Sequence, residues 1–362
     1  MSDELGLLRA ADPVRADEGP WRDRPLHARA ERDLNRLLHS RRTRRAGRRL
    51  VLRAEAAVLA LFAILAFTFS DAGSSPAAAA PAALVPRSDA APVSLDALAR
   101  RAEARARTAG AADGPRRGSH LQTWYMSRES GPDAAPPVTV PEERITRWNA
   151  DGSGSELIVA TDPRHPGRPV IHDDDGHWRT VSDGKVLHRK TYPAGWAAQH
   201  GGLASRTRPP TDPVALRAHL ASLYGGAGGP SRAWGSPHAS GAERGGAAER
   251  GGGAATTPQL LLALDSFRQE WTPGPRETAA IVRMLADAGG LRPAGAVTDR
   301  LGRRGQAYVY DGPDGASNAT RQMVILDPRG GGLLGLEVTF TKDLPDFGIS
   351  SGEVMSYVAW MP

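Results

Sequence analysis

The chain has 362 residues, contains no cysteine and carries a formal net charge of +6. This length suits one or two domains, and the lack of cysteine excludes disulfides, thiolate metal sites and cysteine nucleophiles. Residues 1–53 hold fourteen arginines and eight acidic residues, so the remaining residues sum to zero charge. Nucleic-acid binding needs basic charge on a folded face, so we expect no nucleic-acid partner.

A basic block runs directly into an apolar run near the N-terminus. The run from Leu50 to Phe69, drawn as a helix, is about 30 Å long, which matches the hydrocarbon core of a bilayer. Basic residues stay on the cytoplasmic side, so we expect a single-pass protein of the cell membrane with a cytoplasmic N-terminus. Between Leu34 and Ala54 there are no acidic residues and eight arginines, the first of which is Arg36. The other seven are expected to set the topology and to contact anionic lipid of the inner leaflet: Arg41, Arg42, Arg44, Arg45, Arg48, Arg49 and Arg53.

Two other interpretations of this run remain open. A signal peptide could be cleaved at the small residues Ala77–Ala80, although a basic region of this length before the apolar run is unusual. A buried core helix is disfavoured by the flanking arginines. The expected organisation is a cytoplasmic, largely disordered tail at 1–49, a transmembrane helix at 50–70, an Ala/Pro-rich spacer at 71–92 and an extracytoplasmic domain at 93–362.

Four helices are expected in the outer domain. Ser94 can cap the first, and Asp212-Pro213 opens the second, which ends before Gly225. Thr257-Pro258 opens the third, and the fourth runs from Pro275 to Gly289-Gly290. The intervening segment 225–257 is rich in Gly, Ala and Ser and cannot bury enough apolar surface to order itself, so it is predicted to be a disordered loop.

Strand patterns fill the rest of the domain. Asp-Gly turn signals at 151–152, 175–176, 183–184 and 311–312 separate short apolar stretches. Leu334, Leu336, Val338 and Phe340 alternate with smaller or polar residues, as in a half-buried strand. The spacing predicts an α+β fold: a curved antiparallel sheet, or half-barrel, with helices packed on its concave side, preceded by one transmembrane helix.

The tryptophans are the candidate binding residues. Large aromatic side chains on a sheet usually form core, but a curved sheet lined with them could also enclose an apolar ligand. Both interpretations stay open for Trp124, Trp148, Trp178, Trp271 and Trp360, the five candidate ligand-lining residues.

Two motifs resemble catalytic or metal sites. Gly348-Ile-Ser350-Ser-Gly352 matches the G-x-S-x-G pattern of hydrolases, yet no histidine follows it and a strand rather than a helix is expected after it. The acidic run His172–His177 could offer carboxylates to a hard cation, but a solvated hairpin turn explains it better. We therefore expect no catalytic residue, no metal and no cofactor.

Several segments resemble a family. They are the start Met1–Arg9, the stretch Leu203–Tyr224 with Thr211-Asp212-Pro213, and Leu260–Leu336 with Gly295–Ala307 and Ile325–Gly335. Together with the basic stretch and the single span, they resemble an actinobacterial family of membrane-anchored proteins of uncharacterised activity, often encoded beside extracytoplasmic-function sigma factors. The outer domain of that family is similar to the half-barrel of Lol-type lipoprotein carriers and of the RseB-type anti-sigma regulator.

The topology and the resemblance together imply a non-enzymatic function. We expect a membrane-anchored extracytoplasmic binding or sensor protein, linked to envelope stress or to a sigma-factor regulatory system, with an apolar or polypeptide ligand. The alternative is a lipid or lipoprotein carrier tethered to the membrane.

Overall fold

The computed structural model describes residues 81–87, 92–110, 113–128, 136–174, 177–200, 207–225, 255–311 and 320–361. The chain divides into two units, Met1–Gly73 and Ser74–Pro362, and all described residues belong to the second. The basic tail, the expected membrane helix at 50–70 and residues 226–254 of the expected glycine-rich loop lie outside the described residues. Within the described ranges, no helix is long and apolar enough to cross a membrane.

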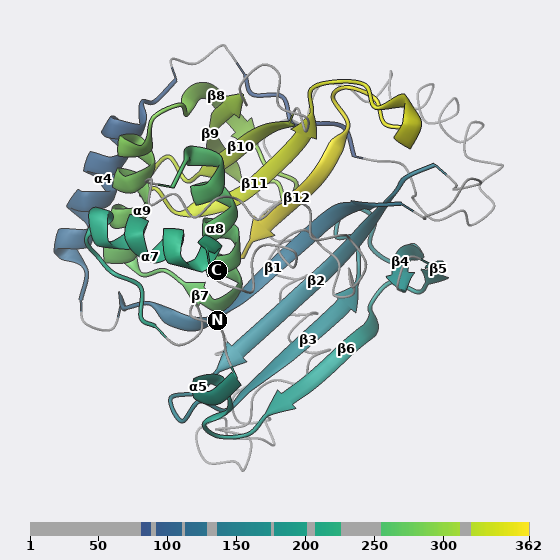
Figure 1. Ribbon diagram of the computed structural model, residues 1–362, viewed down its shortest axis with the longest axis horizontal. Helices are drawn as coiled ribbons and strands as arrows, with labels where there is room; N and C mark the ends of the chain where they lie inside the picture. The colour runs from purple at the N-terminus through teal and green to yellow at the C-terminus, as the bar shows by residue number, and fades with distance from the viewer. Residues whose placement is uncertain are drawn as a thin grey trace, which may run out of the picture. The chain divides into compact units, whose positions relative to one another are not determined.

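A large antiparallel sheet forms the frame of the folded unit (Figure 1). Its strands are ordered β6-β3-β2-β1-β12-β11-β10-β9-β8, so β6 and β8 lie at the two ends and the sheet is not closed. The strands are β1 (Arg116–Ser127), β2 (Val138–Trp148), β3 (Gly154–Ala160), β6 (Lys185–Tyr192), β8 (Arg292–Thr298), β9 (Arg304–Asp311), β10 (Thr320–Leu326), β11 (Leu333–Phe340) and β12 (Val354–Trp360).

Two short strand pieces complete the β structure. β7 (Trp271–Thr272) pairs with the start of β1, and β4 (Val170–Asp174) pairs with β5 (His177–Val181) in a separate hairpin. This hairpin lies between β3 and β6 in the chain, at the acidic run that the sequence assigned to a turn. The expected α+β class with an antiparallel sheet is confirmed.

The helices begin where the sequence predicted. They are α4 (Leu95–Thr108), α7 (Pro213–Gly225), α8 (Thr257–Glu270) and α9 (Pro275–Ala288), with a short α5 (Trp196–His200) after β6. Ser94 Oγ accepts a hydrogen bond from Ala97 N (3.1 Å), and Gln259 Oε1 accepts one from Thr256 N (2.8 Å). Such caps satisfy backbone donors that have no partner inside the helix, so local sequence sets these helix starts.

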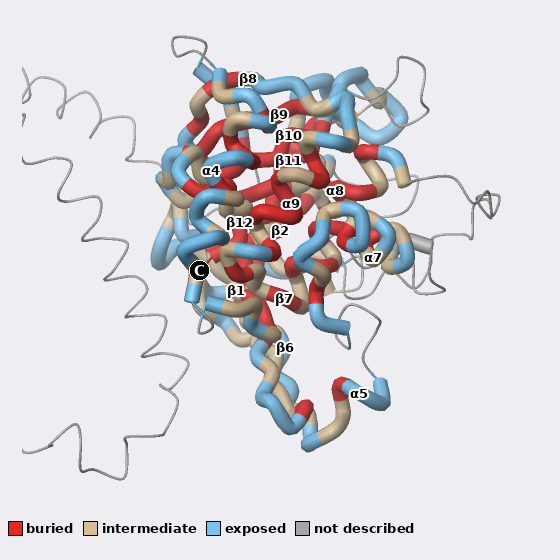
Figure 2. Tube along the Cα trace, turned by 90° about the vertical axis from the view of Figure 1, so that its left-hand side faces the viewer, coloured by how far each residue is buried: buried red, intermediate tan, exposed pale blue. Residues whose placement is uncertain are grey.

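The four longer helices cover one face of the sheet, here called the helix face. Strand side chains alternate between the two faces: Tyr308 and Val324 pack with the helices, whereas Val309 and Met323 belong to a second cluster on the far face. Figure 2 shows the buried segments concentrated where helices and strands overlap. The core therefore has an apolar layer on each face of β9–β12.

The strands β2, β3 and β6 extend beyond the helical layer (Figure 1). The short helix α5 lies near one end of these strands and the β4–β5 hairpin near the other. β5 and β6 are largely exposed along their length. In Figure 1, the four longer helices do not extend over the far ends of these strands.

Residues 81–87, here called the strap, lie on the far face. Leu84 N donates a hydrogen bond to Glu337 Oε1 on β11 (2.9 Å), and Arg87 pairs with Ala296 of β8 through an isolated bridge. The sequence placed these residues inside the spacer at 71–92. The structure differs for these seven residues because their backbone and two apolar side chains have partners on the sheet, which composition alone does not reveal.

Candidate binding site on the uncovered strands

The five candidate tryptophans do not surround one cavity. Trp124, Trp271 and Trp360 are 0%, 6% and 2% exposed, which favours the core interpretation for these three. Trp124 belongs to the far-face cluster, whereas Trp271 and Trp360 belong to the helix-face cluster. Trp178 is partly exposed beside a third cluster around Tyr125, so only Trp148 lies on the uncovered strands near other partly exposed aromatic side chains.

Trp148 is one of three stacked aromatic side chains, here called the aromatic triad: Trp148, Tyr192 and Trp196. The ring centroids of Trp148 and Tyr192 are 5.1 Å apart, those of Tyr192 and Trp196 are 4.3 Å apart, and those of Trp148 and Trp196 are 6.0 Å apart. All three residues are partly exposed. The triad brings together the ends of β2 and β6 and the start of α5.

Glycine makes this stacking geometry possible. Trp148 is paired with Gly154 across β2 and β3, and a Cβ at residue 154 would lie 2.3 Å from the Trp148 ring. Gly195, at φ +75°, lets the chain turn into α5, and its N–H donates to Asp151 O (2.8 Å). The sequence analysis did not single out Tyr192, because its contact with Trp148 depends on strand register.

Cationic side chains lie over the aromatic faces. The Arg117 guanidinium carbon is 5.4 Å from the Trp148 ring centroid, and Lys190 Nζ is 5.0 Å from that of Tyr192. Such contacts contribute about 0.5–1 kcal/mol at exposed sites and more when water is excluded. The rings of Trp148 and Tyr192 are therefore each contacted by a cation while they remain partly exposed.

A polar seam lies next to the triad on the helix face and consists of Arg117, Arg144, Glu156, Asp265 and Glu270. Arg144 of β2 pairs across the sheet with Leu121, a member of the helix-face cluster, which places its side chain on that face. Arg144 Nε lies 3.7 Å from Glu156 Oε1, and the Tyr192 hydroxyl donates to Glu156 Oε2 (2.9 Å). The seam thus joins the strands to the triad.

Two carboxyl groups of α8 complete the seam. Burial raises the pKa of Asp265 to about 7, against the opposing effects of a hydrogen bond from Gln269 and of the positive charges of Arg144 and Arg268. Burial also raises the pKa of Glu270, while the Trp148 indole and the Arg117 guanidinium favour its charged form. Burial thus disfavours the charged form of both carboxyls, and the arginines offset only part of this effect.

The charged side chains of the seam differ in exposure. Asp265 of α8 is buried, at 7% exposed. The side chains of Arg144 and Glu156 are about a quarter exposed and accessible. No group of three or more acidic or histidine side chains in the described ranges could hold a metal ion.

The two catalytic-looking motifs have structural explanations. Ser350 and Ser351 lie exposed in the turn before β12, and Ser351 N donates to Asp343 Oδ1 (2.7 Å). In the acidic run, Asp174 and His177 are paired across the β4–β5 hairpin, and Asp173 accepts a hydrogen bond from Ser127 (2.7 Å). The first agrees with the loop interpretation. In the second a hairpin is present, but Asp173 is buried rather than solvated. Comparison of the chain with protein-family models, curated proteins and solved structures found no match.

Proposed function

We propose that this chain is a membrane-anchored extracytoplasmic binding or sensor protein without enzymatic activity, and that its ligand is a polypeptide. The anchor and its orientation rest on the basic block and the apolar run at 50–70. The curved half-barrel form proposed for the folded unit is supported by the open antiparallel sheet with helices on one face.

The observation that carries the proposal is the partly exposed aromatic triad beside the polar seam, on strands that extend beyond the helical layer. Trp, Tyr and Arg are the residues that most often dominate the binding energy of protein interfaces. Partly exposed rings held by cations offer a rigid contact area at a low cost in conformational entropy. The mixture of rings and charges suits a polypeptide better than an acyl chain.

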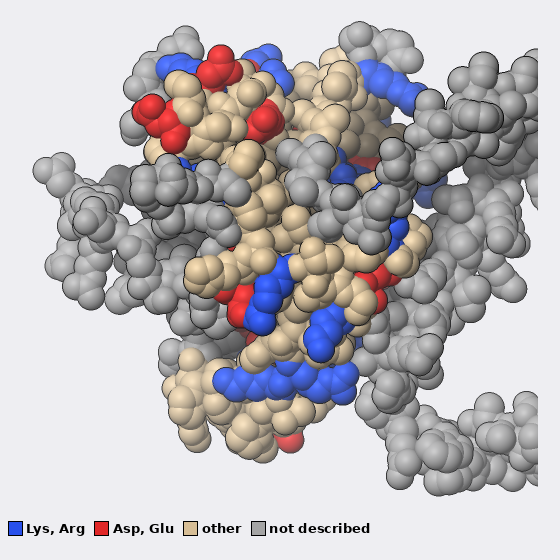
Figure 3. Space-filling view, turned by 90° about the vertical axis from the view of Figure 1, so that its right-hand side faces the viewer, with Lys and Arg blue, Asp and Glu red and all other residues tan. Residues whose placement is uncertain are grey.

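The positive charge of β6 favours a polypeptide ligand with acidic side chains. β6 is the terminal strand of the sheet, carries exposed Lys185, His188, Arg189 and Lys190, and contains no acidic residue. Figure 3 shows basic side chains gathered on this side of the molecule. An extended segment with acidic side chains could pair with the outer edge of such a strand. Lysine also protects edge strands from aggregation, and the experiment below separates these roles.

The helix-face core argues against the carrier alternative. A lipid carrier needs an apolar cavity, but the apolar side chains that α7 and α8 contribute to the helix-face core pack to almost zero exposure: Leu216, Leu220, Leu260, Leu264 and Phe267. Their apolar surface is already buried by one another and by the strands.

Photocrosslinking in cells tests the proposal. A photoreactive residue in place of His188 on β6 should yield a polypeptide adduct, whereas one in place of Val214, an exposed residue of α7, should not. The adduct should weaken when Lys185 and Lys190 are changed to Glu. Adducts of lipid alone, or equal adducts at both positions, would contradict the proposal. Deletion of the gene should change envelope-stress transcription if the regulatory link is correct.

A further inference from the structure

The strap is bound to the far face chiefly through its backbone. Leu84 N donates to Glu337 Oε1 (2.9 Å), Arg300 Nη2 donates to Ala82 O (3.0 Å), and Arg87 N donates to Ala296 O (2.7 Å). Main-chain hydrogen bonds of this kind are how sheets bind extended peptides of varied sequence. The far face therefore holds the strap as a binding site holds a peptide.

Two buried charges form the centre of this contact. Glu337 and Arg300 make an ion pair, and their side chains are 1% and 5% exposed. Burial raises the pKa of Glu337, while Arg300 and the Leu84 N–H favour its charged form. Arg300 also lies over the Tyr357 ring, 4.9 Å from its centroid. An ion pair fixed in this way presents one acceptor and one donor to the backbone of whatever segment lies across it.

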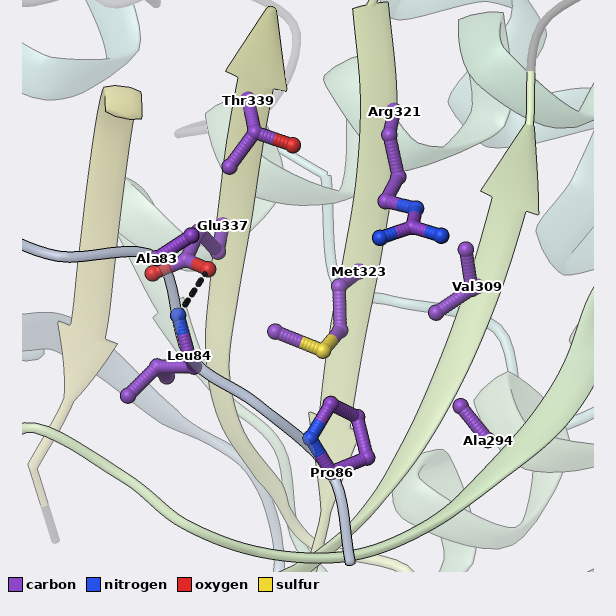
Figure 4. A pocket seen from close by; sticks show the side chains of 9 residues that line it. All are labelled: Ala83, Leu84, Pro86, Ala294, Val309, Arg321, Met323, Glu337 and Thr339. Atoms are coloured by element: carbon purple, nitrogen blue, oxygen red, sulfur yellow. Dashed lines mark hydrogen bonds between the residues drawn. The ribbon is translucent and has the colours of Figure 1, made fainter. Parts of the chain in front are cut away.

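The strap fills its site incompletely. Ala83 and Leu84 pack against the far-face cluster, whereas Val85 is 80% exposed. Between the strap and the sheet remains a cavity of about 160 Å³, shown in Figure 4 and lined by Ala83, Leu84, Pro86, Ala294, Val309, Arg321, Met323, Glu337 and Thr339. The apolar side chains of Val309 and Met323 form part of its wall. Protein interiors are normally close-packed, so a segment with a larger side chain than alanine would fit better.

We propose that this surface is a docking site for an extended apolar segment of a partner polypeptide, and that the strap is a weaker occupant which the partner displaces. The partner segment has a free main-chain N–H opposite Glu337 and a leucine-sized side chain where the strap has Ala83. The site goes beyond the proposed function, because it lies on the opposite face from the aromatic triad.

Displacement of the strap would lengthen the link between the folded unit and the proposed membrane anchor. The strap begins eleven residues after the expected span ends at residue 70. A released strap adds about 3.4 Å of reach per residue, or about 24 Å in all. Partner binding on the far face thereby changes how closely the folded unit is tethered.

Two capped peptides test the site on the full chain in detergent. One has the strap sequence Pro-Ala-Ala-Leu-Val-Pro-Arg, and the other has leucine at its third residue, which corresponds to Ala83. The chain has no cysteine, so an environment-sensitive dye on Val85→Cys reports the strap alone. We expect the leucine peptide to displace the strap at about tenfold lower concentration than the strap peptide.

Two substitutions in the strap itself test whether the cavity limits its affinity. Ala83→Leu fills the cavity from the strap itself and should raise the leucine-peptide concentration needed for displacement by about tenfold. Ala82→Leu, the same change at an exposed residue of the strap, should not. The proposal is overturned if neither peptide moves the dye up to about 1 mM, or if peptide binds without moving it. A strap exchanged between two copies, seen as a dimer, would also overturn it. None of these outcomes affects the crosslinking at β6, so the site at the strap and the proposed function can fail separately.

Discussion

Gly154 is predicted to be essential for the aromatic triad, and Gly154→Ala tests this directly. The added Cβ would lie 2.3 Å from Trp148 Cε3 and 2.6 Å from Arg147 O, far inside van der Waals contact. Gly154 has no left-handed backbone angle, so alanine is compatible with its φ and the effect is steric. The Trp148 ring must move away from the strand and lose its contacts with Tyr192 and Trp196, and the backbone at Arg147 must also shift.

The magnitude follows from these contacts. Overpacking costs about 1–3 kcal/mol, and each lost aromatic pair adds about 0.5–1.5 kcal/mol. A total of about 2–6 kcal/mol, counting both lost pairs, lowers the Tm of a unit of this size by about 5–20 °C. Thermal unfolding of the full chain in detergent, followed by near-ultraviolet circular dichroism, measures both stability and the environment of the indoles.

Gly332→Ala is the matched control. The nearest atom to a Cβ at residue 332 is Asp327 Cβ, at an ordinary 3.9 Å, and this glycine also has no left-handed angle. The control should be unchanged or slightly more stable, by about 0.4–1 kcal/mol, because alanine restricts the unfolded chain. If Gly154→Ala unfolds like this control and keeps its near-ultraviolet spectrum, the triad is not constrained by the register of β2 and β3.

Three further predictions concern charge. Because burial raises the pKa of Asp265 from 3.8 to about 7, its contribution to stability is full below about pH 4 and falls as pH rises to about 7. In the unchanged protein, the free energy of urea unfolding should therefore fall by about 2–4 kcal/mol between roughly pH 4 and roughly pH 8. Asp265→Asn should remove this fall, whereas Asp287→Asn, at an exposed residue, should keep it. Arg303→Ala leaves the fully buried carboxylate of Asp299 unpaired and should cost about 3–5 kcal/mol in the same assay, with part recovered by adding Asp299→Asn. A phosphatase fused after residue 362 should be active outside the cell, and should lose that activity when the arginine block is replaced by glutamine.

The elements that could be predicted from sequence are those with local signals. The cap at Ser94 and the prolines of the later helices set helix starts within a few residues. Alternation in Leu334–Phe340 and the turn at Asp151-Gly152 identify strands, because the side-chain period of a strand is visible in one segment. The α+β class follows from these signals alone.

The candidate site depends on contacts between distant segments, which no local pattern contains. Whether a tryptophan is core or partly exposed depends on the segments that lie beside it: Trp124 is buried in the far-face cluster, whereas Trp148 is partly exposed near Glu270 at the end of α8. Arg144 and Asp265 come from β2 and α8 and meet only in the fold. The strap has a spacer-like composition, and its binding depends on partners far away in the sequence, Glu337, Arg300 and Ala296.

The turn between β8 and β9 carries residues that contact both the strap on the far face and the core on the helix face. These contacts form a route between the strap and the polar seam. Arg300 and Arg303 lie in the turn between β8 and β9. Arg300 holds the strap through Ala82 O, and Arg303 Nη1 donates to Trp360 O (2.6 Å). The Trp360 ring lies under the Arg268 guanidinium, 5.8 Å from its carbon, and Arg268 acts on the charge of Asp265.

A chain of contacts is not itself coupling, because coupling requires that both sites bias one element. That element would be α8, since it carries Arg268 and both carboxyls of the seam. We therefore expect displacement of the strap by the leucine peptide to change hydrogen exchange in α8, and Arg303→Lys to reduce this change while peptide affinity is kept. If α8 exchange is the same with and without peptide, the two faces act independently, and a polypeptide at the triad would be sensed without any effect on the tether.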